Sequence, residues 1–218
     1  MEPKNQKSMK SIIIITLLTT CGMATTMFGQ LSLNFSAGMN NSNCRFEEFK
    51  GLSESPEARL GYCFGVGPEY EISKKIHVQV DFQYSIKGFD TGTGSNLVPS
   101  GFRYQYVDII PEVEFHFLQY LALGLGVNYG VKVDEQIKIS DGDWSEPFVK
   151  TINSTDFGLV FKVEANFKNI FGFVRYNTGL NNIAEGLLTD DNGLLIEDAK
   201  QLNRNLQIGL GYKLRFKL

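Results

Sequence analysis

The sequence is poor in several residue types that mark common functional sites. It has three cysteines, two histidines and one tryptophan among 218 residues. It also lacks an excess of basic residues, because its formal net charge is −3. Nucleic-acid-binding domains usually present a basic patch or stripe. The composition therefore argues against a nucleic-acid partner.

Long apolar runs are also scarce, and the clearest one lies near the N-terminus, at residues 11–20. Three lysines precede it and small residues follow it, which is the layout of a secretory signal peptide. The run is shorter than the about 20 residues that a membrane-spanning helix needs. We expect residues 1–29 to be a cleaved signal peptide and residues 30–218 to form one exported domain.

Without the signal peptide, the chain is more acidic and keeps two cysteines. Removing the three lysines and one glutamate of residues 1–29 changes the net charge from −3 to −5. Cys63 falls in an alternating segment and Cys44 in an expected loop. In an oxidising compartment the two can pair; two free thiols are the other interpretation. No long apolar run remains, so any membrane span must consist of strands.

The most regular pattern covers residues 60–72 and 76–86, separated by a short turn. Apolar residues alternate with polar residues or glycines in both segments, which predicts two strands with one apolar and one polar face. Each is about twice as long as an ordinary strand and close to the roughly 9–11 residues that cross a bilayer. Charges occur only on the polar face. The pattern predicts a barrel with lipid outside and a narrow polar lumen inside.

The whole exported domain repeats this pattern. The predicted strands cover residues 31–39, 60–72, 76–86, 102–118, 121–133, 157–167, 171–180 and 206–218. Their connections are alternately long and short, which is typical of outer-membrane barrels with periplasmic turns and external loops. The fold class is therefore all-β, an eight-stranded antiparallel transmembrane β-barrel. Two irregularities are expected, a bulge or bend at Pro111 and a change of facing near Gly172.

Aromatic residues are sorted by height in this arrangement. Aromatic girdles mark both interfaces of a membrane barrel. The outer ring is predicted to contain Tyr62, Tyr84, Tyr129, Phe157 and Tyr176, and the inner ring Tyr70, Phe117, Phe167, Phe171 and Phe216.

Four segments carry a resemblance to a known family. They are residues 65–70, 106–111, 175–180 and 203–212. With them the chain resembles the small eight-stranded outer-membrane barrels of the OmpX and OmpA-transmembrane type, and more closely the porin-family or PorT-like outer-membrane barrels of the Bacteroidota. The resemblance implies the fold and an outer-membrane location, but implies little about activity.

The polar faces supply the candidate site residues. An eight-stranded barrel has a lumen that side chains can fill, and charges inside it must be paired. We predict a polar network in the lumen made of His77, Asp81, Glu112, Glu114, His116, Lys162, Glu164, Lys213 and Arg215. A metal or acid–base site around the two histidines is an alternative. Ordinary lumen polarity explains them equally well, so we predict no catalytic, cofactor-binding or metal-binding residue.

The function predicted from these features is structural or interaction-related rather than enzymatic. Both histidines face inward, and no outward Ser–His pair is available for a lipid A-modifying enzyme. The expected partners are outer-membrane lipid and lipopolysaccharide, with a protein or ligand partner at external loops 40–57, 134–154 and 181–202. A narrow pore for small solutes is one alternative. A soluble lipocalin-like carrier is another, and it requires apolar residues inside and charges outside.

Overall fold

The computed structural model describes residues 30–47, 56–91, 99–139, 142–147, 152–184 and 200–216. The predicted signal peptide lies outside the described residues. The strands in the described part are β1 (Leu31–Glu47), β2 (Glu57–Ser73), β3 (Ile76–Asp90), β4 (Pro99–Leu118), β5 (Leu121–Ile139), β6 (Trp144–Ser145), β7 (Thr155–Phe167), β8 (Ile170–Gly179) and β9 (Lys200–Phe216). Among the described residues, no helix is long and apolar enough to cross a membrane.

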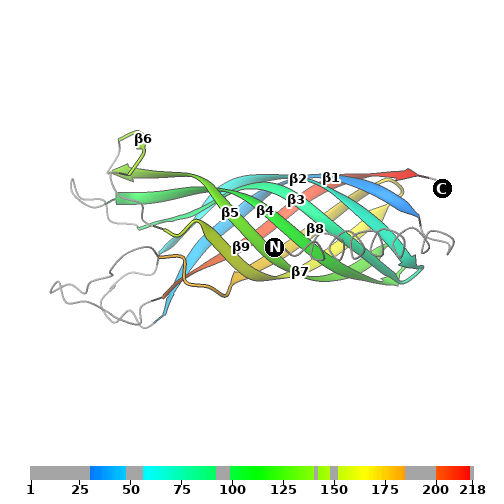
Figure 1. Ribbon diagram of the computed structural model, residues 1–218. Coiled ribbons are helices and arrows are strands. Elements are labelled where there is room, and N and C mark those ends of the chain that lie inside the picture. The colour runs from blue at the N-terminus through cyan, green and yellow to red at the C-terminus, as the bar shows by residue number, and fades with distance from the viewer. Residues whose placement is uncertain are drawn as a thin grey trace, which may run out of the picture.

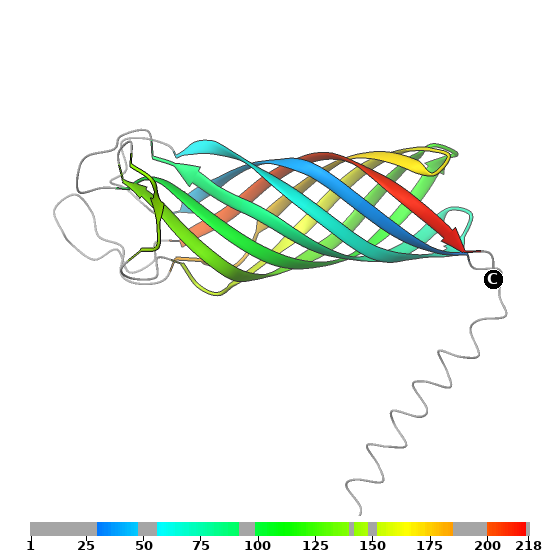
Figure 2. The same ribbon diagram turned by 90° about the horizontal axis from the view of Figure 1, so that it is seen from above.

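Eight of these strands form a closed antiparallel ring (Figures 1 and 2). Sequence neighbours pair around the ring, and β1 pairs with β9 from Leu31↔Phe216 to Glu47↔Lys200 to close it. The two-residue strand β6 is an addition to the end of β5. The start of β1 and the end of β9 lie at the same end as the short turns after β2, β4 and β7. The predicted fold class is confirmed.

Side chains face as the alternation predicts, with apolar residues outside and charges inside. Leu125 and Leu210 on the outer face are 60% and 68% exposed, whereas Glu114 and Lys213 on the inner face are 0% and 3% exposed. Lipid would cover such an apolar exterior, because water provides no favourable contact for it. A lipocalin-like carrier has the opposite arrangement, so the structure excludes that alternative.

The strands are longer than predicted at the end opposite the short turns. β1 continues through residues 40–47, β5 through residues 134–139, and β9 begins at Lys200. Parts of all three loops predicted as the contact surface are therefore strand. The apolar–polar alternation stops at about residue 40 because a barrel wall beyond the bilayer has water on its outer face. Backbone hydrogen bonding between strands does not require alternating apolar and polar side chains, so the strand pairing continues beyond this point.

The aromatic girdles are present, with one correction. Tyr62, Tyr129 and Phe157 are exposed on the outer face near one rim, and Phe117 and Phe167 near the other. Phe171, however, was predicted for the inner girdle and is only 4% exposed, inside the lumen beside Phe173.

The facing of β8 has a simple physical explanation. Gly209 and Gly211 of β9 leave space that the rings of Phe173 and Phe171 fill, and a Cβ at either glycine would collide with them. The predicted change of facing near Gly172 is therefore wrong. β8 pairs with β9 without a register shift from Ile170 to Thr178.

Pro111 also leaves the barrel wall regular. It pairs with Val80 of β3, and β4 keeps the same register with β5 on both sides of it. The expected bulge at this residue is wrong. Register shifts in the β4–β5 pair occur instead near residues 99–101, 105–106 and 116–118.

The two cysteines are free thiols in the lumen wall. Cys44 lies in β1 rather than in a loop and is 4% exposed, and Cys63 in β2 is 1% exposed. Cys44 pairs in register with Asn203, whereas Cys63 pairs with Gly38. The two thiols therefore occupy different heights of the barrel.

Because the outer wall faces lipid, the effect of a charged substitution there on stability should depend on its depth in the membrane. Leu125→Arg, at mid-height on the lipid face of β5, should lower the free energy of unfolding by about 2–4 kcal/mol. Val133→Arg lies on the same face of the same strand, beyond Tyr129, and should cost about 0–1 kcal/mol. Urea unfolding in lipid vesicles measures both, and equal costs would contradict the membrane placement.

Burial of the thiols predicts their reactivity. A water-soluble maleimide should leave both cysteines unlabelled in the folded barrel, because neither sulfur is accessible. Both should be labelled after heat denaturation in detergent, as mass spectrometry of the intact chain will show. Rapid labelling of Cys44 in the folded protein would mean that this end of the barrel opens.

Candidate functional site

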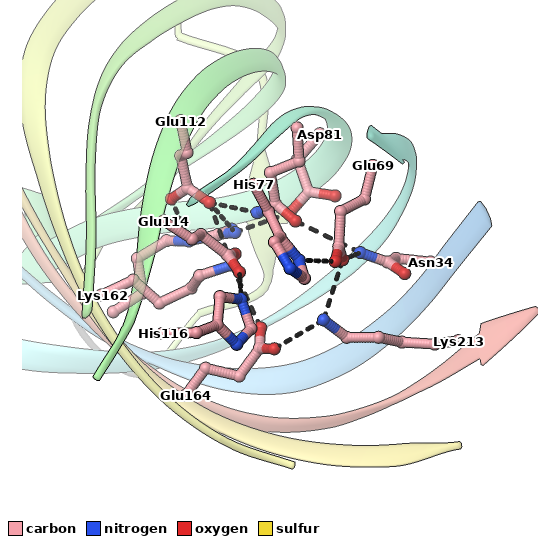
Figure 3. Close-up of polar contacts among 12 residues, drawn as sticks. Asn34, Glu69, His77, Asp81, Glu112, Glu114, His116, Lys162, Glu164 and Lys213 are labelled. Carbon is pink, nitrogen blue, oxygen red and sulfur yellow. Dashed lines mark hydrogen bonds and ion pairs between the residues drawn. The ribbon is translucent and has the colours of Figure 1, made fainter. Parts of the chain in front are cut away.

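The lower lumen, near the short turns, contains one connected cluster of charged side chains that come from six strands, and Figure 3 shows most of its members. We call it the lumen cluster. Its members are Glu69 of β2, His77 and Asp81 of β3, Glu112, Glu114 and His116 of β4, Lys162 and Glu164 of β7, Arg175 of β8 and Lys213 of β9. Five carboxylates thus meet three permanent cations and two histidines.

Arg175 holds the upper part of the cluster together. Its Nη2 donates to Asp81 Oδ2 at 2.6 Å, and its Nε lies 3.1 Å from Glu112 Oε1. The side chain is 2% exposed. A planar guanidinium can bind two carboxylates in fixed directions, so this residue joins β3, β4 and β8 across the lumen.

Lys162 and Lys213 connect the rest of the cluster. Lys162 Nζ lies 3.1 Å from Glu112 Oε2 and 3.2 Å from Glu164 Oε2, and it also contacts Glu114. Lys213 Nζ lies 2.7 Å from Glu164 Oε1 and 2.8 Å from Glu69 Oε2. Each buried charge therefore has a partner of opposite sign, which such burial requires.

Small residues on β5 make these contacts possible. β5 separates β4 from β7, and its inward positions here are Ala122, Gly124 and Gly126. A Cβ on Gly124 would contact the Lys162 side chain, and one on Gly126 would contact Glu112. The missing side chains allow Lys162 of β7 to reach the carboxylates of β4 over the intervening strand.

The two histidines form the lower end of the cluster. Their rings are stacked, with centroids 3.8 Å apart and an angle of 29° between planes. His77 Nδ1 lies 2.6 Å from Glu69 Oε1, and His116 Nε2 lies 3.3 Å from Glu114 Oε2. Both rings line a cavity of about 280 Å³ at the end of the barrel, together with Glu69 and Lys213.

The upper lumen is filled by other groups. Lys87 Nζ donates to Asp108 at 2.9 Å and to Asp156 at 3.1 Å. Above this triad, side chains from strands and loops form an apolar cluster that includes Cys44, Phe89, Tyr104, Tyr106, Ile152 and Ile183. Side chains therefore occupy the lumen at three successive levels.

Eight of the nine predicted lumen residues lie in the lumen cluster, and Arg215 does not. Its side chain is exposed at the short-turn end, where Nη2 donates to the carbonyl of Lys168 at 2.9 Å. It lies at the last inward position of β9, where water is accessible.

Sequence reasoning placed Glu69 among the inward-facing charged residues but left it out of the predicted network, and it did not identify Arg175. Glu69 faces inward by alternation, but it has no special spacing to the others. Arg175 stands between outward-facing Val174 and Tyr176, which indicates an inward position. The irregular pattern around Phe171 concealed that signal.

Comparison with known proteins agrees with this architecture. Residues 22–185 match the family described as the outer membrane protein beta-barrel domain. The chain belongs to this family. As a member of the outer membrane protein beta-barrel domain family, it is an outer-membrane protein, in agreement with its apolar exterior and two aromatic girdles.

Two solved structures are similar to this family member. Neisserial surface protein A (NspA) has a TM-score of 0.50 at 11% identity, over 84% of this chain and 97% of that chain. Ail of Yersinia pestis, in complex with the heparin analogue sucrose octasulfate, has a TM-score of 0.46 at 15% identity, over 85% of this chain and 99% of that chain. No curated protein matches the sequence.

The central position of Arg175 predicts a large effect of its removal. Arg175→Met should lower the free energy of unfolding by about 3–5 kcal/mol, because Asp81 and Glu112 lose their shared cation in a buried site. Arg215→Met, on the neighbouring strand but exposed, should change it by no more than about 0.5 kcal/mol. Urea unfolding in vesicles, with folding checked by heat-modifiable gel migration, measures both. A loss below 1 kcal/mol for Arg175→Met would show that the cluster does not depend on it.

Proposed function

We propose that this protein is a non-enzymatic outer-membrane barrel with a sealed lumen, which acts through its external end. The observation that carries the proposal is the filling of the lumen. Ion-paired charges occupy its lower part, the Lys87 triad lies above, and the apolar cluster lies above that. A solute would have to break several buried ion pairs to pass, and each break leaves an uncompensated charge.

The residues available for chemistry also support a non-enzymatic role. His77 and His116 both point into the lumen and contact carboxylates. Both rings line the cavity at the short-turn end of the lumen rather than the lipid-facing wall. Acid–base catalysis on a membrane lipid requires a catalytic side chain within hydrogen-bonding distance of that lipid.

The external end presents a defined polar surface. The strand extensions beyond the outer girdle raise it above the membrane. There the guanidinium groups of Arg59 and Arg103 both lie over the ring of Trp144, at 4.2 and 4.3 Å from its centroid. Arg59 also pairs with Asp90 at 2.7 Å. We propose this rim, with the segments predicted as external loops (40–57, 134–154 and 181–202), as the contact surface for a protein or ligand partner, and the outer wall as the contact with membrane lipid and lipopolysaccharide.

Conductance in planar lipid bilayers tests the sealed lumen. The refolded barrel should give no ion-conducting steps, because side chains fill its lumen. A general porin measured in the same bilayers shows that the assay detects an open channel. Discrete, reproducible steps from the refolded protein would contradict the proposal and favour the narrow pore for small solutes.

A second measurement addresses the enzymatic alternative. Lipid A extracted from cells that produce the protein in the outer membrane should have the same mass spectrum as lipid A from cells without it. A new acylation or deacylation product that depends on the protein would overturn the non-enzymatic assignment.

A further inference from the structure

The lower end of the lumen cluster brings together four side chains of types that bind transition metals. They are Glu69 of β2, His77 of β3, and Glu114 and His116 of β4. One potential ligand atom from each lies within 4.8 Å of all the others. Three adjacent strands supply them, and the pairing of His77 with Glu114 fixes their relative heights.

The contacts of the carboxylates leave one oxygen of each directed at an imidazole. Glu69 Oε2 binds Lys213 and Asn34, whereas its Oε1 faces His77. Glu114 Oε1 contacts Lys162, whereas its Oε2 faces His116. Lys213 and Lys162 therefore bind the oxygens that point away from the imidazoles and so orient the two carboxylates. Groups outside a metal's own ligands orient those ligands in the same way.

Two of these facing atoms have no hydrogen bond. Glu114 Oε2 and His116 Nε2 are buried and 3.3 Å apart, but their geometry does not satisfy hydrogen bonding. Buried polar atoms normally have a partner. A metal ion bound by both atoms would satisfy them together.

The charge balance of the lumen cluster points the same way. Five carboxylates, Glu69, Asp81, Glu112, Glu114 and Glu164, face three permanent cations, Lys162, Arg175 and Lys213. The carboxylates and permanent cations of the cluster therefore sum to a charge of −2. One divalent cation would balance this charge.

From this geometry we propose that Glu69, His77, Glu114 and His116 form a binding site for a divalent transition metal, with zinc as the representative ion. Two imidazole nitrogens and two carboxylate oxygens suit zinc and its neighbours, whereas calcium and magnesium prefer oxygen ligands only. Ligands about 2.0–2.1 Å from zinc are closer together than 4.8 Å, so the side chains draw inward on binding. The cavity that His77 and His116 line gives the ion a route from the short-turn, periplasmic end.

The occupied site would connect the ends of β2, β3 and β4 beside their turns. The sheet is irregular there, with a register shift between Glu71 and Ser73 in the β2–β3 pair and another between His116 and Leu118 in the β4–β5 pair. A metal that binds only the folded barrel stabilises it in proportion to the logarithm of its concentration over Kd. We therefore assign the site a structural role at the periplasmic end.

Zinc titration of the full refolded barrel tests the proposal. The protein carries no polyhistidine tag, is stripped with EDTA, and is titrated calorimetrically with zinc chloride. One zinc ion per barrel should bind. His77→Gln and His116→Gln should each weaken binding by about tenfold or more. Glu135→Gln removes a buried lumen carboxylate outside the cluster and should leave binding unchanged.

Two results would overturn the site. One is the absence of stoichiometric binding by the folded wild type. The other is binding that persists in the His77→Gln/His116→Gln double variant, because zinc would then be held elsewhere. Heat-modifiable migration shows whether each variant folds. If a variant does not fold, X-ray absorption of the zinc-loaded wild type decides, since two imidazole ligands support the site and none contradicts it.

Discussion

The structure depends on hydrogen bonding between β1 and β9, the first and last strands of the ring. Without this pairing, two strand edges would expose their N–H and C=O groups to hydrocarbon, where no water can satisfy them. The pairing extends along the full length of both strands, so the ladder is closed at every height of the membrane. Closure with eight strands also fixes the bore of the barrel.

The narrow bore explains the composition of the interior. In a lumen of this width, inward side chains from different strands meet at the axis, and water does not separate them. Charges there must pair, which they do around Arg175, Lys162 and Lys213. Glycines on β5 and β9 create the space for long or aromatic side chains from neighbouring strands. The same crowding fills the lumen with side chains and brings His77 and His116 into contact.

Much of the fold was predictable because its signals are local. Alternation between Leu60 and Ile86 determined which residues face lipid, and connection lengths determined which strands neighbour each other. The errors have physical causes too. Cys44 was placed in a loop because strands outside the membrane do not need an apolar face. Phe171 was placed in a girdle because its space comes from Gly209 and Gly211, which are distant in sequence. Pro111 fits the ladder without a bulge.

By itself, the sequence determined the barrel, its facing and its membrane location, since each follows from periodicity within single segments and from turn length. Only the tertiary structure decided which charges pair and where. Arg175 meets Asp81, and Glu69 meets His77 and Lys213, because closure and register bring those strands together at one height. The spacing of these residues along the chain does not predict such contacts. They depend on which strands lie between the partners, and on small residues in those strands that leave room for the longer side chains.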